Sequence, residues 1–143
     1  MPVWFNCDQV NLKIYNRRKF KSWIRETIIQ KRKNPGIINI VFVSKEEILR
    51  INNQYLQHNY FTDIITFDYS ERNLVSGDLF ICIDVVKENA KEYSLSLNEE
   101  LKRVVIHGIL HLLGFNDKTE EEKATMRHEE NLSLLPVKDL LIA

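Results

Sequence analysis

The sequence predicts an α+β fold in which a small central mixed sheet of about four strands is packed by about five helices. Two observations support this class. Short apolar runs rich in β-branched residues cluster in the middle of the chain, and helical patterns come before and after them. With 143 residues, the chain is expected to form a single domain over residues 1–143.

The first half is expected to contain an amphipathic helix and the first strands. Residues 16–33 form the helix, which ends at Asn34-Pro35-Gly36. Its apolar face repeats at helical spacing and consists of Phe20, Trp23, Ile24, Thr27 and Ile28. The strands expected here are a buried one at residues 37–43 and a short one near 3–5.

The middle of the chain alternates between capping signals and apolar runs. Ser44 and Glu47 form a capping box that opens a helix reaching about Tyr55. Residues 64–67 and 79–83 are strands, with a turn at 73–77 between them.

From residue 84 onward the pattern is helical. A first helix carries Val85, Val86, Ala90 and Tyr93. Ser96 and Glu99 cap the next helix, Gly114 stops it, and Thr119 with Glu122 caps the last.

Composition restricts the class of protein. Apolar residues make up 44 % and charged residues 28 %, which is typical of a globular protein and excludes wholesale disorder. Cys7 and Cys82 stand far apart, so neither a disulfide framework nor a cysteine-rich zinc module is expected. The chain shows no signal peptide and no membrane span, and we expect a reduced, cytoplasmic protein.

Charge is balanced overall but unevenly distributed. Twenty basic residues offset twenty acidic ones, yet the region after Thr119 is acidic and the first quarter is basic. The basic residues there are Lys13, Arg17, Arg18, Lys19, Lys21, Arg25, Lys31, Arg32 and Lys33. This pattern fits a face that binds a polyanion, and it fits equally well an ordinary solvated helix surface.

The segment from His107 to Asp117 carries the chemistry. His107 and His111 are four residues apart on one predicted helix, so both imidazoles can reach one metal ion. Gly114 can then reverse the chain and bring Asp117 back as a third ligand. Two imidazoles, one carboxylate and an open fourth position are the layout of a catalytic zinc site. The alternative is a pair of core histidines. His58 and His128 are expected at the surface or beside the site.

Position 108 separates this pattern from zinc peptidases. Those enzymes place a glutamate directly after the first histidine as general base, whereas this chain has Gly108. A bound metal can still act as a Lewis acid, and a phosphodiester is a reasonable target.

The same segment resembles the HGxLHLxGYDH signature of the YbeY family, which comprises bacterial metal-dependent endoribonucleases of rRNA maturation. Residues 51–55 (INNQY) and 61–67 (FTDIITF) resemble the family's LNxxY and PTDVLSF blocks, and 77–82 (GDLFIC) resembles its GDIxIS block. Met126 and Glu130 match the family's MxxxE tail. The similarity extends over roughly residues 47–130.

This resemblance implies a zinc-dependent endoribonuclease that prefers single-stranded RNA. Its task would be maturation of the 3′ end of small-subunit (16S) rRNA and ribosome quality control, with rRNA and the small subunit as partners and no organic cofactor. His107 and His111 would bind one zinc ion, and Asp117 stands where the family has a third histidine. If Asp117 points away, Asn116 or water would take that place.

A second departure concerns the substrate. The family's arginine thought to engage RNA phosphate is replaced by Leu56, which cannot bind phosphate. His58, or basic residues of the first helix such as Arg17 and Arg18, are the candidate substitutes. Asp63 either orients a ligand histidine or caps a turn, and Cys82 is expected to be a buried small residue.

Aromatic residues in the same region are candidates for stacking on bases: Tyr60, Phe61, Phe67 and Tyr69, with core packing the favoured role for Phe67. Two other functions remain open. One is a non-catalytic ribosome-assembly or RNA-binding factor stabilised by its metal. The other, which Gly108 disfavours, is a metallopeptidase.

Overall fold

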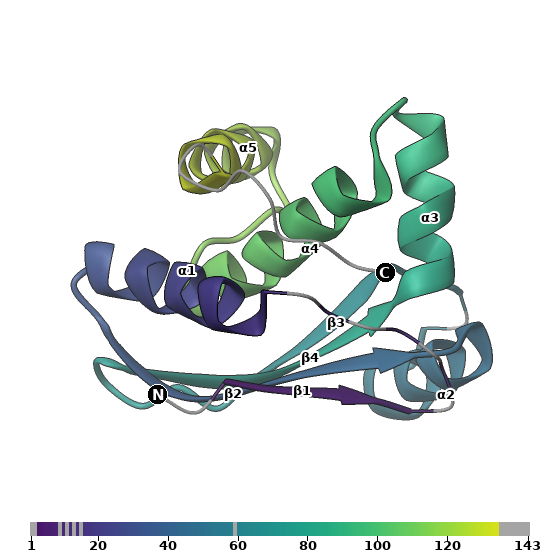
Figure 1. Cartoon of the computed structure of the whole chain (residues 1–143), viewed down its shortest axis with the longest axis horizontal. Helices are drawn as coiled ribbons and strands as arrows, with labels where there is room; N and C mark the ends of the chain where they lie inside the picture. Colours follow the sequence, from purple (N-terminus) through teal and green to yellow (C-terminus); the bar gives the residue numbers. More distant parts are fainter. Residues whose placement is uncertain are drawn as a thin grey trace.

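A four-stranded mixed sheet forms the frame of the molecule (Figure 1). The computed structural model describes residues 3–8, 10, 12, 14, 16–58 and 60–134. The strands are β1 (Val3–Cys7), β2 (Asn34–Val43), β3 (Ile64–Asp68) and β4 (Leu74–Cys82), in the order β1-β2-β4-β3. β1 and β4 run parallel to β2, whereas β3 is antiparallel to β4.

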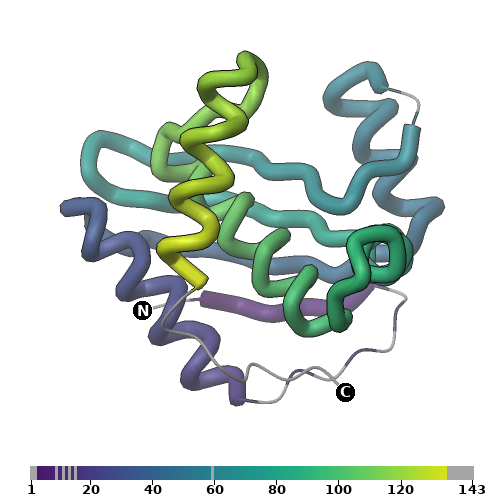
Figure 2. Tube along the Cα trace, turned by 90° about the horizontal axis from the view of Figure 1, so that it is seen from above, coloured from purple at the N-terminus to yellow at the C-terminus, as the bar shows by residue number. Residues whose placement is uncertain are grey.

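Five helices cover the two faces of this sheet within the described residues. They are α1 (Arg17–Gln30), α2 (Lys45–Leu56), α3 (Ile83–Glu92), α4 (Leu97–Leu112) and α5 (Glu120–Leu134). α1, α3, α4 and α5 lie on one side, and seen from above α5 crosses over α4 (Figure 2). The α+β class, the strand number and the helix number agree with the sequence prediction.

The two faces of the sheet have separate hydrophobic cores because side chains alternate along each strand. Ile40, Leu79 and Ile81 belong to the larger core, which also holds the apolar faces of α1 and α4. The smaller core lies under α2 and includes Ile48, Ile51, Ile65 and Cys82. Cys82 is therefore the buried small residue that the sequence predicted.

Close approach at Gly108 lets α4 lie directly on the sheet. A Cβ at this position would stand 2.8 Å from Cδ1 of Ile64 and 3.0 Å from Cδ2 of Leu79. Position 108 thus faces β3 and β4, which is the physical reason for a glycine inside a long helix.

Several boundaries differ from the prediction. α1 ends at Gln30, and β2 already begins at Asn34, with a register irregularity between Pro35 and Ile38. The turn predicted at 73–77 lies earlier, because Glu71 bridges Leu74 and β4 begins there. Gly77 sits inside β4, where the carbonyl of Phe67 and the side chain of Leu112 leave no room for a Cβ.

Helix caps follow the sequence closely. Ser96 and Glu99 form both halves of a capping box at α4, and Thr119 and Glu122 do the same before α5. Ser44 caps α2, while the carboxylate of Glu47 accepts from Arg50. None of the helices in the described parts of the chain is long and apolar enough to cross a membrane.

Candidate metal centre

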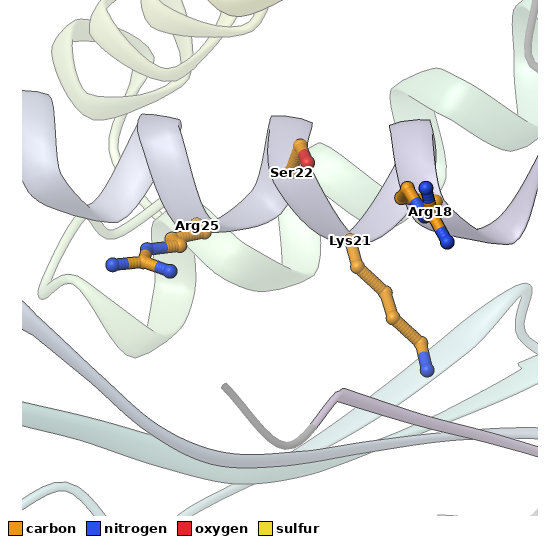
Figure 3. Close-up of a pocket in the computed structure, with 4 residues that line it drawn as sticks. All are labelled: Arg18, Lys21, Ser22 and Arg25. Carbon is orange, nitrogen blue, oxygen red and sulfur yellow. The ribbon is translucent and has the colours of Figure 1, made fainter.

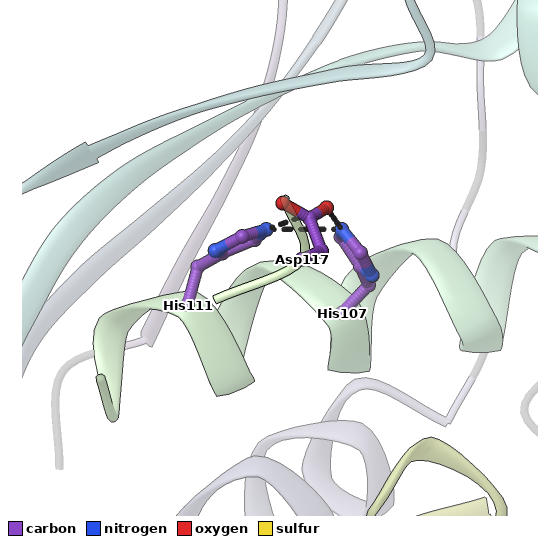
Figure 4. A group of neighbouring side chains, drawn as sticks. All are labelled: His107, His111 and Asp117. Carbon is purple, nitrogen blue, oxygen red and sulfur yellow. Dashed lines mark hydrogen bonds and ion pairs between the residues drawn. The ribbon is translucent and has the colours of Figure 1, made fainter. Parts of the chain in front are cut away.

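The end of α4 brings three potential ligands together. His107 and His111 project from the same side of the helix, one turn apart (Figure 4). Gly114 then adopts φ +100°, and the N–H of Phe115 donates to the carbonyl of Leu110 at 3.0 Å. This turn ends the helix and returns the chain, so that Asp117 points at both imidazoles.

The three candidate ligand atoms are as far apart as three corners of a zinc tetrahedron would be. Nε2 of His107 and Nε2 of His111 are 3.0 Å apart, and Oδ2 of Asp117 lies 3.2 and 3.3 Å from them. Tetrahedral zinc ligands at about 2.05 Å from the metal are about 3.3 Å from one another. The three residues therefore form a group that can hold one metal ion.

Exposure leaves one side of this group open. The side chains of His107 and His111 are 25 % and 28 % exposed, and that of Asp117 is 39 % exposed. A metal held by these three residues would keep a coordination position that solvent or substrate can reach.

Glu130 of α5 supports His107 from behind. The Nδ1–H of His107 donates to Oε2 of Glu130 at 2.6 Å, and the carboxylate of Glu130 is nearly buried. Arg103 donates to the other oxygen, Oε1, at 3.0 Å. This contact fixes the imidazole tautomer, so that the free Nε2 faces the other two ligands.

The electrostatics of His107 follow from these neighbours. Burial lowers the pKa of His107, but the hydrogen bond and charge of Glu130, together with Asp117 and Asp63, outweigh burial and raise it overall. In the absence of a metal, His107 therefore holds its proton more tightly than a free imidazole does, because its pKa lies above the ordinary value.

A polar cavity of about 190 Å³ adjoins the far side of His107. Asp63, Glu100 and Glu130 line it together with two arginines, Arg103 and Arg127. Burial raises the pKa of Asp63 and of Glu100, and one oxygen of Glu100 has no hydrogen-bond partner within the described residues.

The contacts of Asp63 bear on the two roles that the sequence left open for it, orienting a ligand histidine or capping a turn. Its carboxylate accepts weakly from Thr62 and Asn89, at 3.5 and 3.4 Å, and its carbonyl accepts from the N–H of Cys82. It lines the same cavity as His107 and contributes to the raised pKa of that histidine.

Other candidate residues lie away from this group. His58 is exposed after α2, where its ring stacks on Tyr60 and its Nδ1 lies 3.0 Å from the Tyr60 hydroxyl. Arg17 and Arg18 are exposed in the first turn of α1. His128 is exposed on α5, and Lys13 lies outside the described residues.

The sequence did not reveal what Glu130 contacts. The signal in the sequence is spacing: Met126 and Glu130 are four residues apart and so share one face of a mostly polar helix, and the structure buries both of them. A buried acid on a polar helix needs a partner, and a histidine of the metal pattern is the natural one.

Comparison with known proteins agrees with these observations. A family model described as "Endoribonuclease YbeY" matches residues 5–138. Curated relatives of that name include one from Azobacteroides pseudotrichonymphae, 51 % identical over 83 % of this chain and 86 % of its own length. Another, from Parabacteroides distasonis, is 45 % identical over 95 % and 97 %.

Among solved structures, the solution structure of a protein from Thermotoga maritima matches with a TM-score of 0.63 and 25 % identity. The match covers 94 % of this chain and 90 % of that one. The family resemblance inferred from the motifs is thereby confirmed. Since the order of the motifs and the similarity over most of the chain agree, this chain belongs to the endoribonuclease YbeY family.

Proposed function

We propose that this protein is a zinc-dependent endoribonuclease that cuts single-stranded RNA. The observation that carries the proposal is the convergence of Nε2 of His107, Nε2 of His111 and Oδ2 of Asp117 at separations of 3.0–3.3 Å. Family membership supplies the reaction class, since the similar proteins are named endoribonucleases.

His107, His111 and Asp117 would hold one zinc ion. A bound zinc ion would supply Lewis-acid polarisation of a phosphodiester oxygen and of the attacking water. Glu130 holds the His107 ring so that its Nε2 lone pair faces the ligand group. Asp117 adds a negative charge where a third imidazole would be neutral, so water at this site should be less acidic than at a three-histidine site.

The cellular role follows from the family resemblance. We propose maturation of the 3′ end of small-subunit (16S) rRNA and ribosome quality control in the cytoplasm, with the small ribosomal subunit as partner. The histidine of the α2–β3 connection contributes to this proposal: His58 stacks on Tyr60, and Phe61 beside them is exposed. Flat exposed rings of this kind can stack on unpaired bases.

A peptidase is disfavoured by the packing around position 108. The proteolytic pattern needs a glutamate there, but even a Cβ would stand 2.8 Å from Ile64. A non-catalytic assembly factor is the remaining alternative, and it draws support from Leu56, which offers no charge to a phosphate.

Cleavage of single-stranded RNA by the zinc-loaded protein, with and without chelator, tests the proposal. We expect chelator, His111→Ala and Asp117→Ala each to abolish cleavage. His128→Ala, which removes an exposed histidine on α5, is the matched control and should cleave normally. Chelator-resistant cleavage, or equal cleavage by His111→Ala, would refute metal catalysis. Unaltered RNA binding without any cleavage would favour the assembly factor.

A further inference from the structure

The exposed side of α1 carries a cluster of cations, here called the basic face and defined as Arg18, Lys21 and Arg25 with Ser22 between them. These four residues line a pocket of about 320 Å³ (Figure 3). They are spaced at helical intervals opposite the apolar side of α1, which packs into the core through Phe20, Trp23 and Ile24.

Among the described residues, the cations of the basic face have no acidic partner: no ion pair or side-chain hydrogen bond there involves Arg18, Lys21 or Arg25. Lys31, farther along the chain, shows the contrast: it pairs with Glu129 of α5 and lies over the ring of Phe115. The charge of the basic face is therefore available to a partner.

The basic face and the metal centre belong to opposite edges of the sheet. α1 contacts β2, and its Phe20 packs edge-on against Phe5 of β1. α4 contacts β3, and Asp63, directly before β3, shares a cavity with His107. β1 and β3 are the outer strands, so three strand spacings, about 14 Å in all, separate the two edges.

We infer that the basic face is an RNA-backbone anchor separate from the metal centre, so that one RNA is held at two places. This inference rests on the proposed function for its choice of polyanion. Arg18 and Arg25 are seven residues apart, which is about 10 Å along a helix, and a stacked strand carries a phosphate about every 3.4 Å. Three flexible cations over that length can each reach a different phosphate, and Ser22 adds a hydroxyl donor.

Such an anchor makes efficiency depend on RNA length. A trinucleotide bound at the metal centre cannot extend across the sheet, whereas an RNA of about 20 nucleotides can reach both places. The anchor adds binding energy for the long RNA and none for the short one. It should therefore lower KM for the long RNA and leave kcat unchanged.

The test compares the full-length protein with the triple variant Arg18→Gln, Lys21→Gln, Arg25→Gln. The matched control, Arg72→Gln, Lys87→Gln, Lys91→Gln, removes the same charge from exposed positions on other elements. Binding of the long RNA is measured in chelator at several salt concentrations. We expect the anchor variant to bind at least about tenfold more weakly, with a salt slope reduced by about 2, since each single-strand phosphate contact contributes about 0.7.

Cleavage provides a second readout. In the anchor variant, the ratio of kcat/KM for the long RNA to that for the trinucleotide should fall about tenfold, because KM for the long RNA rises. The control should keep the ratio of the parent. Equal salt slopes in anchor variant and control would overturn the inference. The inference would also fail if the anchor variant lost as much binding to polyglutamate as to RNA, because the basic face would then be a site for acidic protein. Failure of the parent to cleave any RNA refutes the proposed function instead, and the binding arm still decides on the anchor.

Discussion

Single residues decide whether the metal centre is assembled. Gly108 is the simplest case. Because it has no side chain, α4 can approach Ile64 and Leu79, and this close packing places His107 and His111 at the β3 side of the sheet. Glu130 is a second case, because its carboxylate on α5 selects which nitrogen of His107 is free to face the other two candidate ligands.

Glu130→Ala should weaken metal binding. Removing the carboxylate frees the His107 ring and loses the partner of Nδ1, and supporting residues of this kind are worth about 10- to 100-fold in metal affinity. Glu130→Gln keeps an acceptor oxygen and should lose less. Competition of zinc against a chromophoric chelator measures both. Glu129→Ala, which removes the neighbouring ion pair with Lys31, is the control; an equal loss there would show a general effect on α5.

Glu100→Gln should make the metal-free protein more stable at neutral pH. Burial raises the pKa of Glu100, so the folded state holds this proton more tightly than the unfolded state, whose pKa is near 4.5. The cost of ionising Glu100 on folding is absent below pH 4.5 and grows as pH rises through the folded-state pKa.

Urea unfolding from acidic to neutral pH measures this effect. The stability gain of Glu100→Gln should disappear toward pH 4.5. If the substitution instead destabilises the protein at neutral pH, the ion pair of Glu100 with Arg103 outweighs the burial of its charge.

At the scale of the element, the way α4 ends matters more for the metal centre than the length of α4. Gly114 closes the helix at φ +100°, and the three residues that follow bring Asp117 back over the two histidines. The same turn therefore ends the helix and positions Asp117.

Gly114→Ala should cost both stability and metal affinity. A Cβ at positive φ is strained by about 1–2 kcal/mol, although nothing lies within 4 Å of it, so the penalty is one of backbone conformation and not of contact. Relief of the strain moves Asp117. Gly114→Asn, which tolerates positive φ better, should lose less.

Ser96→Ala is the control, because it removes the cap at the other end of α4 and costs about 1 kcal/mol. It should leave zinc affinity unchanged in a chelator competition. If Gly114→Ala binds zinc as tightly as the parent, the turn does not place Asp117.

How much of the molecule the sequence predicts also depends on the element. The sequence predicts best the elements that have local signals: the capping boxes at Ser96 and Thr119 and the stop at Gly114 use contacts within five residues. The turn at 73–77 was misplaced because Gly77 looks like a turn residue, whereas it is required by Leu112, a residue 35 positions away. Contacts of that range, like that of His107 with Glu130, leave no local pattern.

For the whole molecule, metal binding and folding should be linked. The proposed ligands come from α4 and the loop after it, and α5 supports them, so only the folded chain presents the site. Zinc at about 100 times its Kd should therefore add about 2.7 kcal/mol to the free energy of unfolding.

Urea unfolding with zinc and with chelator measures this linkage. The double variant His107→Ala, His111→Ala should show no difference between the two conditions. The His58→Ala, His128→Ala variant, which removes two exposed histidines, should respond as the parent does. A zinc response that survives in the first variant would place the ion elsewhere.

The position of Glu130 has a consequence for synthesis on the ribosome. The ligand residues leave the ribosome before the glutamate that orients the first of them, because α5 follows them in the chain. α5 also closes over α1, where the indole N–H of Trp23 donates to the carbonyl of Ser133. A nascent chain that stops short of α5 therefore carries every proposed ligand, but it lacks both the orienting acid and the contact between α1 and α5, so the finished centre forms only after α5 has been synthesised.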